Sequence, residues 1–383
     1  MNQTARDKPY YDLQATYARH PVGAPLTDTF IEILKFYFEP EEARLAAHMG
    51  FEPEPEEAIA RRAGMSLDEA APLLTRMASR YFVRGFRRPD GVRTFRLHIL
   101  ALGAGLFEVT FDMPNMSPDM EKLGELWNKY FRDGWGREMH GSGISVCRAL
   151  PAVSVYKENV VRFEDALDLV KNAGMLTLNP CACRQAFRAC DDPVEVCIGL
   201  SGAVPGGQEP GMPLMDPAKM SELVGRIASA DEVVDALQRA EEAGLVHISM
   251  NHKDDPWFIC NCCRHACGLL RGVTELGITH AVAPSSYWTM VDEDMCSGCE
   301  NCVERCPVGA ISMREDGVAE VMHEKCLGCG VCALVCGPGA LTLEKRDDLI
   351  FTPYEDDREL FTLLAERKGV AYPVHHHQAV IPG

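Results

Sequence analysis

The chain has 383 residues, of which 46% are hydrophobic and 25% charged, and this composition excludes wholesale disorder. Its formal net charge of −18 disfavours nucleic acid or an anionic membrane as the main partner of the whole chain. The chain has 17 cysteines, and all but Cys147 follow position 180. The N-terminus lacks an export-signal pattern and no apolar stretch is long enough to span a bilayer, so we expect a cytoplasmic protein whose cysteines bind metal or do redox chemistry.

The first predicted element is a helix that begins at Thr27 or Asp28. It is too apolar for a solvated helix, because it carries Phe30, Ile31, Leu34, Phe36, Tyr37 and Phe38. We therefore expect residues 1–56 to pack on the segment that follows them.

Residues 57–98 form a locally basic segment, with nine arginines, four acidic residues and a net charge of +5. Two helices joined at Met65-Ser66 lead into two strands around Pro89-Asp90-Gly91, which is a hairpin-turn signal. This order of helix, turn, helix and two-stranded wing resembles a winged-helix domain. The resemblance implies a DNA-binding surface, and a small helical domain that docks a protein partner is the alternative.

Residues 99–289 are predicted to form an α/β domain rich in cysteine. A helix over 163–174 precedes a strand over 175–178, and a helix over 229–244 precedes a strand over 245–250. Each strand leads to a cysteine motif. Parallel neighbouring strands would bring their carboxyl ends, and so both motifs, to one edge of the layer.

Residues 290–346 contain a cysteine pattern written twice. Cys296-x2-Cys299-x2-Cys302-x3-Cys306-Pro307 is followed by Cys326-x2-Cys329-x2-Cys332-x3-Cys336. The pattern resembles that of two-cluster bacterial ferredoxins and departs from it at Gly337, which precedes the proline. Two 4Fe-4S clusters are expected, one held by Cys296, Cys299, Cys302 and Cys336, the other by Cys326, Cys329, Cys332 and Cys306. Zinc is the alternative metal, but four equally spaced cysteines are not zinc spacing.

Eight further cysteines lie in the middle region: Cys181, Cys183, Cys190, Cys197, Cys260, Cys262, Cys263 and Cys267. They could hold one or two more iron–sulfur clusters, with zinc as the alternative. The adjacent thiols of Cys262 and Cys263 should diverge if the backbone is extended, which favours ligands shared between the two motifs.

Several neighbours of these cysteines have two interpretations. His265 could be a ligand, or a surface residue that only lies near the metal. Nearby arginines could stabilise a reduced cluster, hold an anionic substrate or simply neutralise acidic residues: Arg184, Arg188 and Arg264. Cys147 is expected to be a buried apolar residue.

The domain order resembles that of multidomain, ferredoxin-type iron–sulfur proteins of anaerobic bacteria. We expect a multidomain α+β fold with a winged-helix-like domain (1–98), an α/β cysteine-rich domain (99–289), a two-cluster ferredoxin domain (290–346) and a tail (347–383). The tail carries a predicted helix and a weak metal candidate, His375 to His377.

The leading functional hypothesis is an electron carrier, or a subunit of a cytoplasmic redox complex, that passes low-potential electrons to or from a flavoprotein or a ferredoxin-dependent enzyme. No G-x-G-x-x-G or Walker motif suggests a nucleotide cofactor. A redox-sensing winged-helix regulator is the first alternative. A reductase with substrate bound at a middle-domain cluster is the second.

Overall fold

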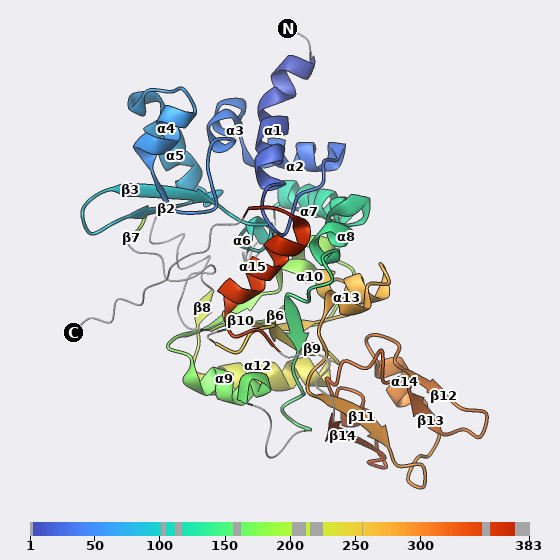
Figure 1. Ribbon diagram of the computed structural model, residues 1–383. Coiled ribbons are helices and arrows are strands. Elements are labelled where there is room, and N and C mark those ends of the chain that lie inside the picture. The colour runs from blue at the N-terminus through green and yellow to red at the C-terminus, as the bar shows by residue number, and fades with distance from the viewer. Residues whose placement is uncertain are drawn as a thin grey trace.

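The computed structural model describes residues 3–100, 105–111, 117–155, 162–200, 212–214, 225–254, 256–346 and 353–371. The segment over 201–213 is rich in Gly and Pro, which predicts a loop, and most of it lies outside these residues, as do the three tail histidines. Helices gather at the N-terminal end, a six-stranded sheet occupies the middle, and a small cysteine-dense unit protrudes at the far end (Figure 1). No helix among the described residues is long and apolar enough to cross a membrane.

The N-terminal layer consists of α1 (Gln3–Tyr17), α2 (Asp28–Tyr37) and α3 (Pro40–Ala46). Thr27 caps α2, because its side chain accepts a hydrogen bond from the backbone N–H of Phe30 at 3.1 Å. The predicted helix start is therefore confirmed. Its apolar residues are buried as expected, except Phe36, which is 38% exposed.

The basic segment folds as two helices and a hairpin, α4 (Glu56–Arg62), α5 (Leu67–Ser79), β2 (Val83–Arg87) and β3 (Arg93–Leu97). Helix α5 begins in a capping box between Ser66 and Glu69. Two short strands flank the hairpin in a sheet of order β1-β3-β2-β7, with β1 at Glu54–Pro55 and β7 at Met212–Pro213. The predicted hairpin is confirmed.

Three helices that the sequence pattern did not predict connect this layer to the middle region. They are α6 (Leu106–Phe111), α7 (Pro118–Tyr130) and α8 (Gly136–His140). Helix α7 packs against both α2 and α10 (Ala182–Phe187). Aromatic side chains fill the space between them, among them the fully buried Trp127 and Trp135, whose ring centroids lie 4.9 Å apart. The helices therefore form one continuous core with the cysteine-rich region.

The middle sheet has the strand order β4-β9-β10-β6-β5-β8, and every adjacent pair is antiparallel. Its strands are β4 (Cys147–Ala149), β5 (Leu176–Pro180), β6 (Glu195–Leu200), β8 (Arg226–Ile227), β9 (Val246–Met250) and β10 (Phe258–Cys262). The prediction of parallel strands was wrong. Short returns such as the one from β9 to β10 join antiparallel neighbours and leave no room for a crossover helix.

The two faces of this sheet carry different partners. Helices α9 (Ala166–Asn172) and α12 (Ala230–Glu242) cover one face, where they pack with Leu178, Ile198 and Ile259. Side chains alternate along β10, so Cys260 and Cys262 point to the opposite face, toward the helical core. Antiparallel pairing therefore still places both cysteine motifs on one face.

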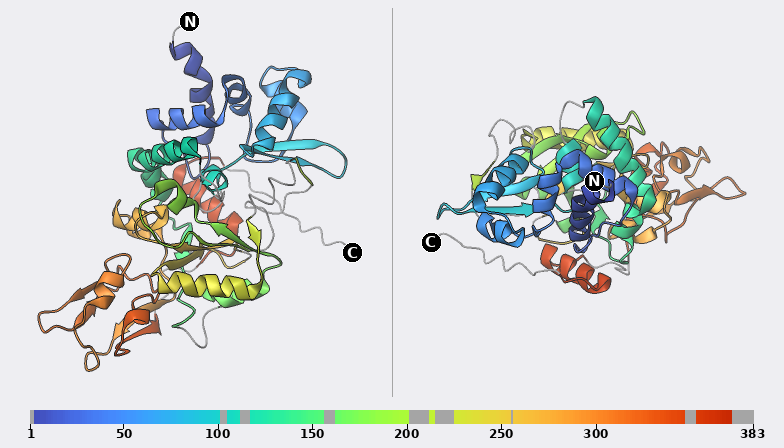
Figure 2. Two further views of the ribbon diagram at one scale, coloured as in Figure 1. Left: turned by 180° about the vertical axis from the view of Figure 1, so that it is seen from behind. Right: turned by 90° about the horizontal axis from the view of Figure 1, so that it is seen from above.

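The cysteine-dense unit contains two small sheets. Strand β11 (Tyr287–Val291) pairs with β14 (Leu341–Lys345), and β12 (Ile311–Met313) pairs with β13 (Ala319–Val321) through a turn at Asp316-Gly317. Helix α14 (Asn301–Arg305) follows the first cysteine loop. This unit and the β2–β3 hairpin lie at opposite ends of the molecule (Figures 1 and 2).

The tail folds back along the molecule. Helix α15 (Asp357–Lys368) was predicted, and Lys368 at its end donates hydrogen bonds to the carbonyl of Val22 at 3.2 Å and to that of Glu138 at 2.6 Å. The tail helix thus fastens the loop after α1 to α8.

Candidate functional site

The outer ferredoxin set consists of Cys296, Cys299, Cys302 and Cys336. All four line one surface cavity, although Cys336 comes from the second half of the repeat. Cys299 is exposed, while Cys302 is buried. The structure thus brings together the residues predicted to hold the first cluster, and four thiols around one cavity fit a cubane's four irons.

The inner ferredoxin set consists of Cys306, Cys326, Cys329 and Cys332, all of them buried. The pKa of Cys332 is raised to about 12, chiefly by burial, with a hydrogen bond from Thr289 lowering it and the neighbouring Cys326 and Cys306 thiols adding to the rise. Cys306 therefore joins the second set, as predicted. Metal binding here must displace protons, since thiols with raised pKa values are otherwise protonated.

The two ferredoxin sets are neighbours. Cys302 of the outer set is close enough to Cys332 of the inner set to raise its pKa, although burial has the largest effect. One end of the unit is therefore open to solvent at Cys299, and the other end is enclosed.

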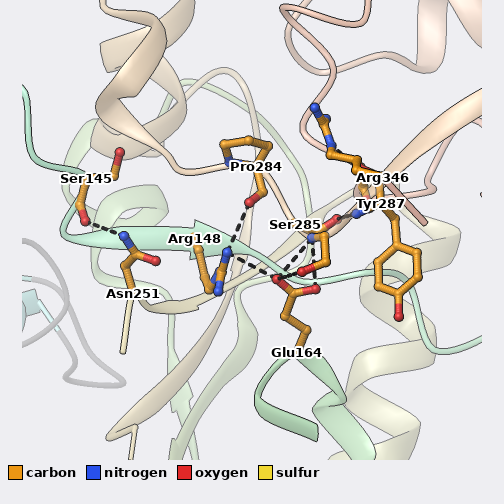
Figure 3. A network of polar contacts seen from close by, with 10 residues as sticks. Ser145, Arg148, Glu164, Asn251, Pro284, Ser285, Tyr287 and Arg346 are labelled. Carbon is orange, nitrogen blue, oxygen red and sulfur yellow. Dashed lines mark hydrogen bonds and ion pairs between the residues drawn. The ribbon is translucent and has the colours of Figure 1, made fainter. Parts of the chain in front are cut away.

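A buried ion pair joins the inner end to the middle region (Figure 3). Arg148 on β4 lies 3.1 Å from Glu164, and both side chains are at most 1% exposed. Glu164 also accepts hydrogen bonds from the backbone N–H of Ser286, at 3.0 and 2.9 Å, and from its hydroxyl at 3.1 Å. These bonds compensate the buried carboxylate, so they fix the chain just before β11.

The loop that carries the inner set is held by backbone contacts as well. The N–H of Ala152 donates to the carbonyl of Cys329 at 2.9 Å, and the N–H of Ser285 donates to that of Leu327 at 2.9 Å. Arg346 donates to the carbonyl of Cys326 at 2.6 Å. The inner set is therefore packed rigidly against the middle region.

The middle sulfur set consists of six thiols from both motifs, Cys181, Cys183, Cys197, Cys260, Cys262 and Cys267. Cys197 shares hydrogen bonds with Cys181 and Cys260, and Cys183 shares one with Cys267. The predicted meeting of the two motifs is thus seen in the geometry. Six thiols are enough for a four-iron cluster, and each motif contributes.

Cys267 is the most acidic position in this set. Burial raises its pKa, but hydrogen bonds from Cys183, from Cys262 and from the backbone N–H groups of Leu270 and Leu269 outweigh burial and hold the pKa well below the usual value. The two N–H groups belong to the first turn of α13 (Gly268–Thr274). Cys267 is therefore stabilised as a thiolate, the form that binds metal.

Arg184 is the cation at the centre of these sulfurs. Its side chain is buried and donates to the carbonyl of Asn261 at 2.9 Å. Burial lowers its pKa, but the charges of Cys181, Cys197 and Cys263 raise it more. Arg188 behaves differently, because it pairs with Glu121 at the surface at 2.9 Å. Of these two arginines, the structure places Arg184 alone against the sulfurs.

The adjacent thiols of Cys262 and Cys263 do point to different groups, as predicted. Cys262 joins the middle sulfur set, whereas the Sγ atom of Cys263 lies 3.5 Å from that of Cys190. His265 approaches this second pair, with its Nδ1 atom 3.7 Å from a carboxylate oxygen of Asp192. We refer to Cys190, Asp192, Cys263 and His265 as the Cys190 group.

Two buried features adjoin the middle sulfur set, and the sequence patterns pointed only to the first of them. Cys147 is buried as expected, and Cys267 is near enough to raise its pKa, after the larger effect of burial. His247 contacts the Asn261 amide oxygen through Nδ1 and Glu241 through Nε2, the latter at 2.9 Å. Asn261 stands between Cys260 and Cys262 on β10. Because side chains alternate along a strand, this order could have indicated that Asn261 faces away from the two cysteines.

Comparison with known proteins identifies one part of the chain. Residues 289–343 match the family model described as a 4Fe-4S dicluster domain. Over 31 residues the chain is 52% identical to a "Probable ferredoxin" of Methanosarcina thermophila, a match covering 8% of this chain and 53% of that protein. The chain thus spans about half the length of the curated relative it matches. No solved structure matches it. The C-terminal part of this chain, residues 289–343, is a ferredoxin-type domain.

Proposed function

We propose that this chain is an iron–sulfur electron-transfer protein of the cytoplasm, acting as a carrier or as a subunit of a redox complex. The observation that carries the proposal is the order of the thiols. Exposed Cys299 belongs to the outer ferredoxin set, the enclosed inner set follows, and the middle sulfur set lies in the region on which the inner set is packed. A low-potential electron would follow this order in either direction.

The outer ferredoxin set lies at the end of the molecule where a redox partner would dock. Its exposed rim lets a flavoprotein or a ferredoxin-dependent enzyme approach the first 4Fe-4S cluster. Each iron of a cluster bound by four thiolates is already ligated, so the two ferredoxin clusters would transfer electrons without binding substrate.

The contact between the ferredoxin unit and the middle region supports the next step. Arg305, which precedes Cys306, donates to the carbonyl of Glu242 at 2.7 Å at the end of α12. Glu241, in the same turn, contacts His247, and His247 contacts Asn261 between two of the middle cysteines. A short, packed path therefore leads from the inner set toward the middle sulfur set.

The middle sulfur set favours a cluster over one zinc ion. A tetrahedral zinc ion with bonds of about 2.3 Å needs sulfurs about 3.8 Å apart. Among the described residues, no three members of this set have ligand atoms that all lie within 4.8 Å of one another. A four-iron cluster has a separate iron for each thiolate and so accepts wider spacing.

The regulator hypothesis has less support. Most arginines of the basic segment are engaged in ion pairs within the molecule, and these are Arg62 with Glu54, Arg76 and Arg80 with Glu42, Arg88 with Asp90, and Arg93 with Glu56. The exposed first turn of α5 is acidic, with Asp68 and Glu69. These charges would repel phosphates. The reductase hypothesis requires an iron without a protein ligand, which spectroscopy with substrate analogues can test.

The test is a measurement of iron, acid-labile sulfide and EPR-monitored reduction on the anaerobically purified full chain. We expect more iron than the roughly eight atoms that two four-iron clusters hold, and midpoints toward the low end of a range of about −700 to +450 mV. The acidic ferredoxin segment motivates the low potentials. Midpoints well above 0 mV, or iron for the ferredoxin clusters alone, would contradict the proposal.

Cys183→Ser makes this test specific for the middle set. It should remove the additional iron, speed hydrogen exchange around Cys260 and Cys267, and leave the ferredoxin EPR signals intact, because those ligands are self-contained. Cys147→Ser is the matched control, since Cys147 is buried nearby and should retain all iron. Independent loss of one cluster per motif would show that the motifs do not share a cluster.

A further inference from the structure

The Cys190 group differs from every other set of cysteines in the molecule by its compactness. Ligand atoms of Cys190, Asp192, Cys263 and His265 all lie within 4.8 Å of one another. Among the described residues, this is the one group of three or more Cys, His, Asp or Glu side chains that meets this limit. The two thiols are 3.5 Å apart, close to the roughly 3.8 Å expected around one tetrahedral ion with metal–sulfur bonds of about 2.3 Å.

This spacing argues against a shared cluster at these two thiols. Two thiolates bound to different irons of one cubane are held farther apart than two thiolates on a single ion. Cys263 also points away from Cys262, which belongs to the middle sulfur set. The eight middle cysteines therefore divide into six and two, rather than four and four.

The four side chains come from two loops with matching patterns. Cys190-x-Asp192 lies between α10 and β6, and Cys263-x-His265 follows β10 directly. Each pattern presents two ligands within three residues, and Cys263-x-His265 does so in a turn over 264–266. The N–H of Ala266 donates to the Cys263 sulfur at 3.3 Å, which fixes that thiol. Cys263 is 3% exposed, whereas His265 stands at the rim of the group with 47% of its side chain exposed.

The donor set suits one borderline-soft divalent ion. Two thiolates, one imidazole and one carboxylate are ligands of zinc and of ferrous iron, and four of them complete a tetrahedron. With a divalent ion the site would carry about one excess negative charge, from three anionic ligands. Nearby arginines are placed to balance it: Arg184 contacts Cys263, and Arg305 is close enough to Asp192 for the carboxylate to influence its pKa, after the larger effect of burial.

We propose that Cys190, Asp192, Cys263 and His265 form a mononuclear metal site, for zinc or ferrous iron, that is separate from the iron–sulfur clusters. The ion would tie the loop after α10 to the loop after β10. Arg264, between two of the ligands, donates to the carbonyl of Glu304 on α14 at 3.4 Å. The site therefore sits where the middle region meets the ferredoxin domain, beside the packed path described above.

The test uses zinc as the probe and substitutes the two ligands at the rim, because they are the ones least needed for folding. The full chain and its Asp192→Asn and His265→Ala variants are produced in zinc-supplemented medium and purified anaerobically. Zinc, iron and sulfide are then measured on the same samples. Asp191→Asn is the matched control, because the neighbouring exposed carboxylate is lost while the ligands remain.

We expect the unsubstituted chain and Asp191→Asn to bind one zinc ion each. Asp192→Asn and His265→Ala should each weaken zinc binding at least about tenfold in competition with a chromophoric chelator, since even loss of a residue that only orients a ligand has that effect. Iron and sulfide should not change. The absence of both zinc and iron in excess of sulfide from the unsubstituted chain, or such metal surviving both substitutions, would overturn the proposal. Loss of iron and sulfide in these variants would also overturn it, by assigning Cys190 and Cys263 to a cluster, and would leave the electron-transfer proposal standing.

Discussion

A single buried guanidinium controls the charge around the middle sulfur set. Arg184 is 3% exposed and lies within range of Cys181, Cys197 and Cys263, so little water screens its charge from the sulfurs. A cluster gains negative charge when it is reduced, and a nearby cation favours that state. Arg188, one turn further along the chain, lies at the surface and provides the natural comparison.

Arg184→Gln should therefore lower the midpoint potential of the centre proposed for the middle sulfur set. A unit charge roughly 9 Å from an added electron contributes about 2 kcal/mol at an effective dielectric constant near 20, which sets the expected shift on the order of 80 mV for one electron. An EPR-monitored redox titration measures the shift. Arg188→Gln should leave the potential unchanged, and an equal shift in both variants would mean that Arg184 acts only through the net charge of the chain.

The elements show where sequence patterns succeed and where they stop. Helices with clear caps were predictable, because Thr27 and Ser66 are typical N-cap residues at their first turns. Strand β10 was not recognised as a strand, since its cysteines and Asn261 conceal the alternation of a half-buried strand. Strand direction was also predicted wrongly, because the local helix-then-strand pattern does not reveal which strands become neighbours.

The sets of candidate ligands also differ in how far the sequence alone could predict them. The convergence of the outer ferredoxin set on one cavity followed from the sequence pattern, in which three closely spaced cysteines share a loop and the second half of the repeat supplies Cys336. The meeting of the two middle motifs could be suspected but not resolved into partners, since it depends on the pairing of β6, β9 and β10. Asp192 was not predicted as a ligand, because only the fold shows that its loop lies beside Cys263 and His265.

The β2–β3 hairpin is the element on which the DNA-binding hypothesis depends. Arg87 and Arg88 are exposed near its tip, but Arg88 pairs with Asp90 at 2.9 Å. We expect Arg87→Ala with Arg88→Ala to weaken a pull-down of an acidic protein partner and to leave DNA binding negligible at physiological salt. Fluorescence anisotropy with duplex DNA checks this. Nanomolar affinity that falls, with a shallower salt dependence, in the double variant would instead support the regulator hypothesis.

At the scale of the whole molecule, the ferredoxin unit is docked to the middle region by a charged contact with almost no solvent. The Arg148–Glu164 pair stands at that junction (Figure 3). Glu164 also accepts hydrogen bonds from Ser286 there. A rigid junction keeps the distance between the inner ferredoxin set and the middle sulfur set constant. Electron transfer between the clusters proposed for these two sets would depend on that distance.

Glu164→Gln should loosen this junction, because it removes the carboxylate charge that pairs with the buried Arg148 guanidinium. Removing one partner of a buried pair costs about 3–5 kcal/mol. Hydrogen exchange should quicken at Ser285, Ser286 and Leu327, and reduction of the middle centre by way of the ferredoxin clusters should slow. Glu320→Ala, which removes an exposed carboxylate from β13, is the control and should change neither. Unchanged exchange in Glu164→Gln would mean that backbone contacts alone hold the junction.

The exposure of Cys299 bears on how oxygen would inactivate the protein. Cys299 is exposed, whereas the other three cysteines of the outer set are buried or half-buried, so its sulfur is the ligand most accessible to oxidants. With the ligands assigned as proposed, oxygen would damage the molecule from the outside inward. The docking end would fail first, and the enclosed centres would be cut off from their partner while still intact.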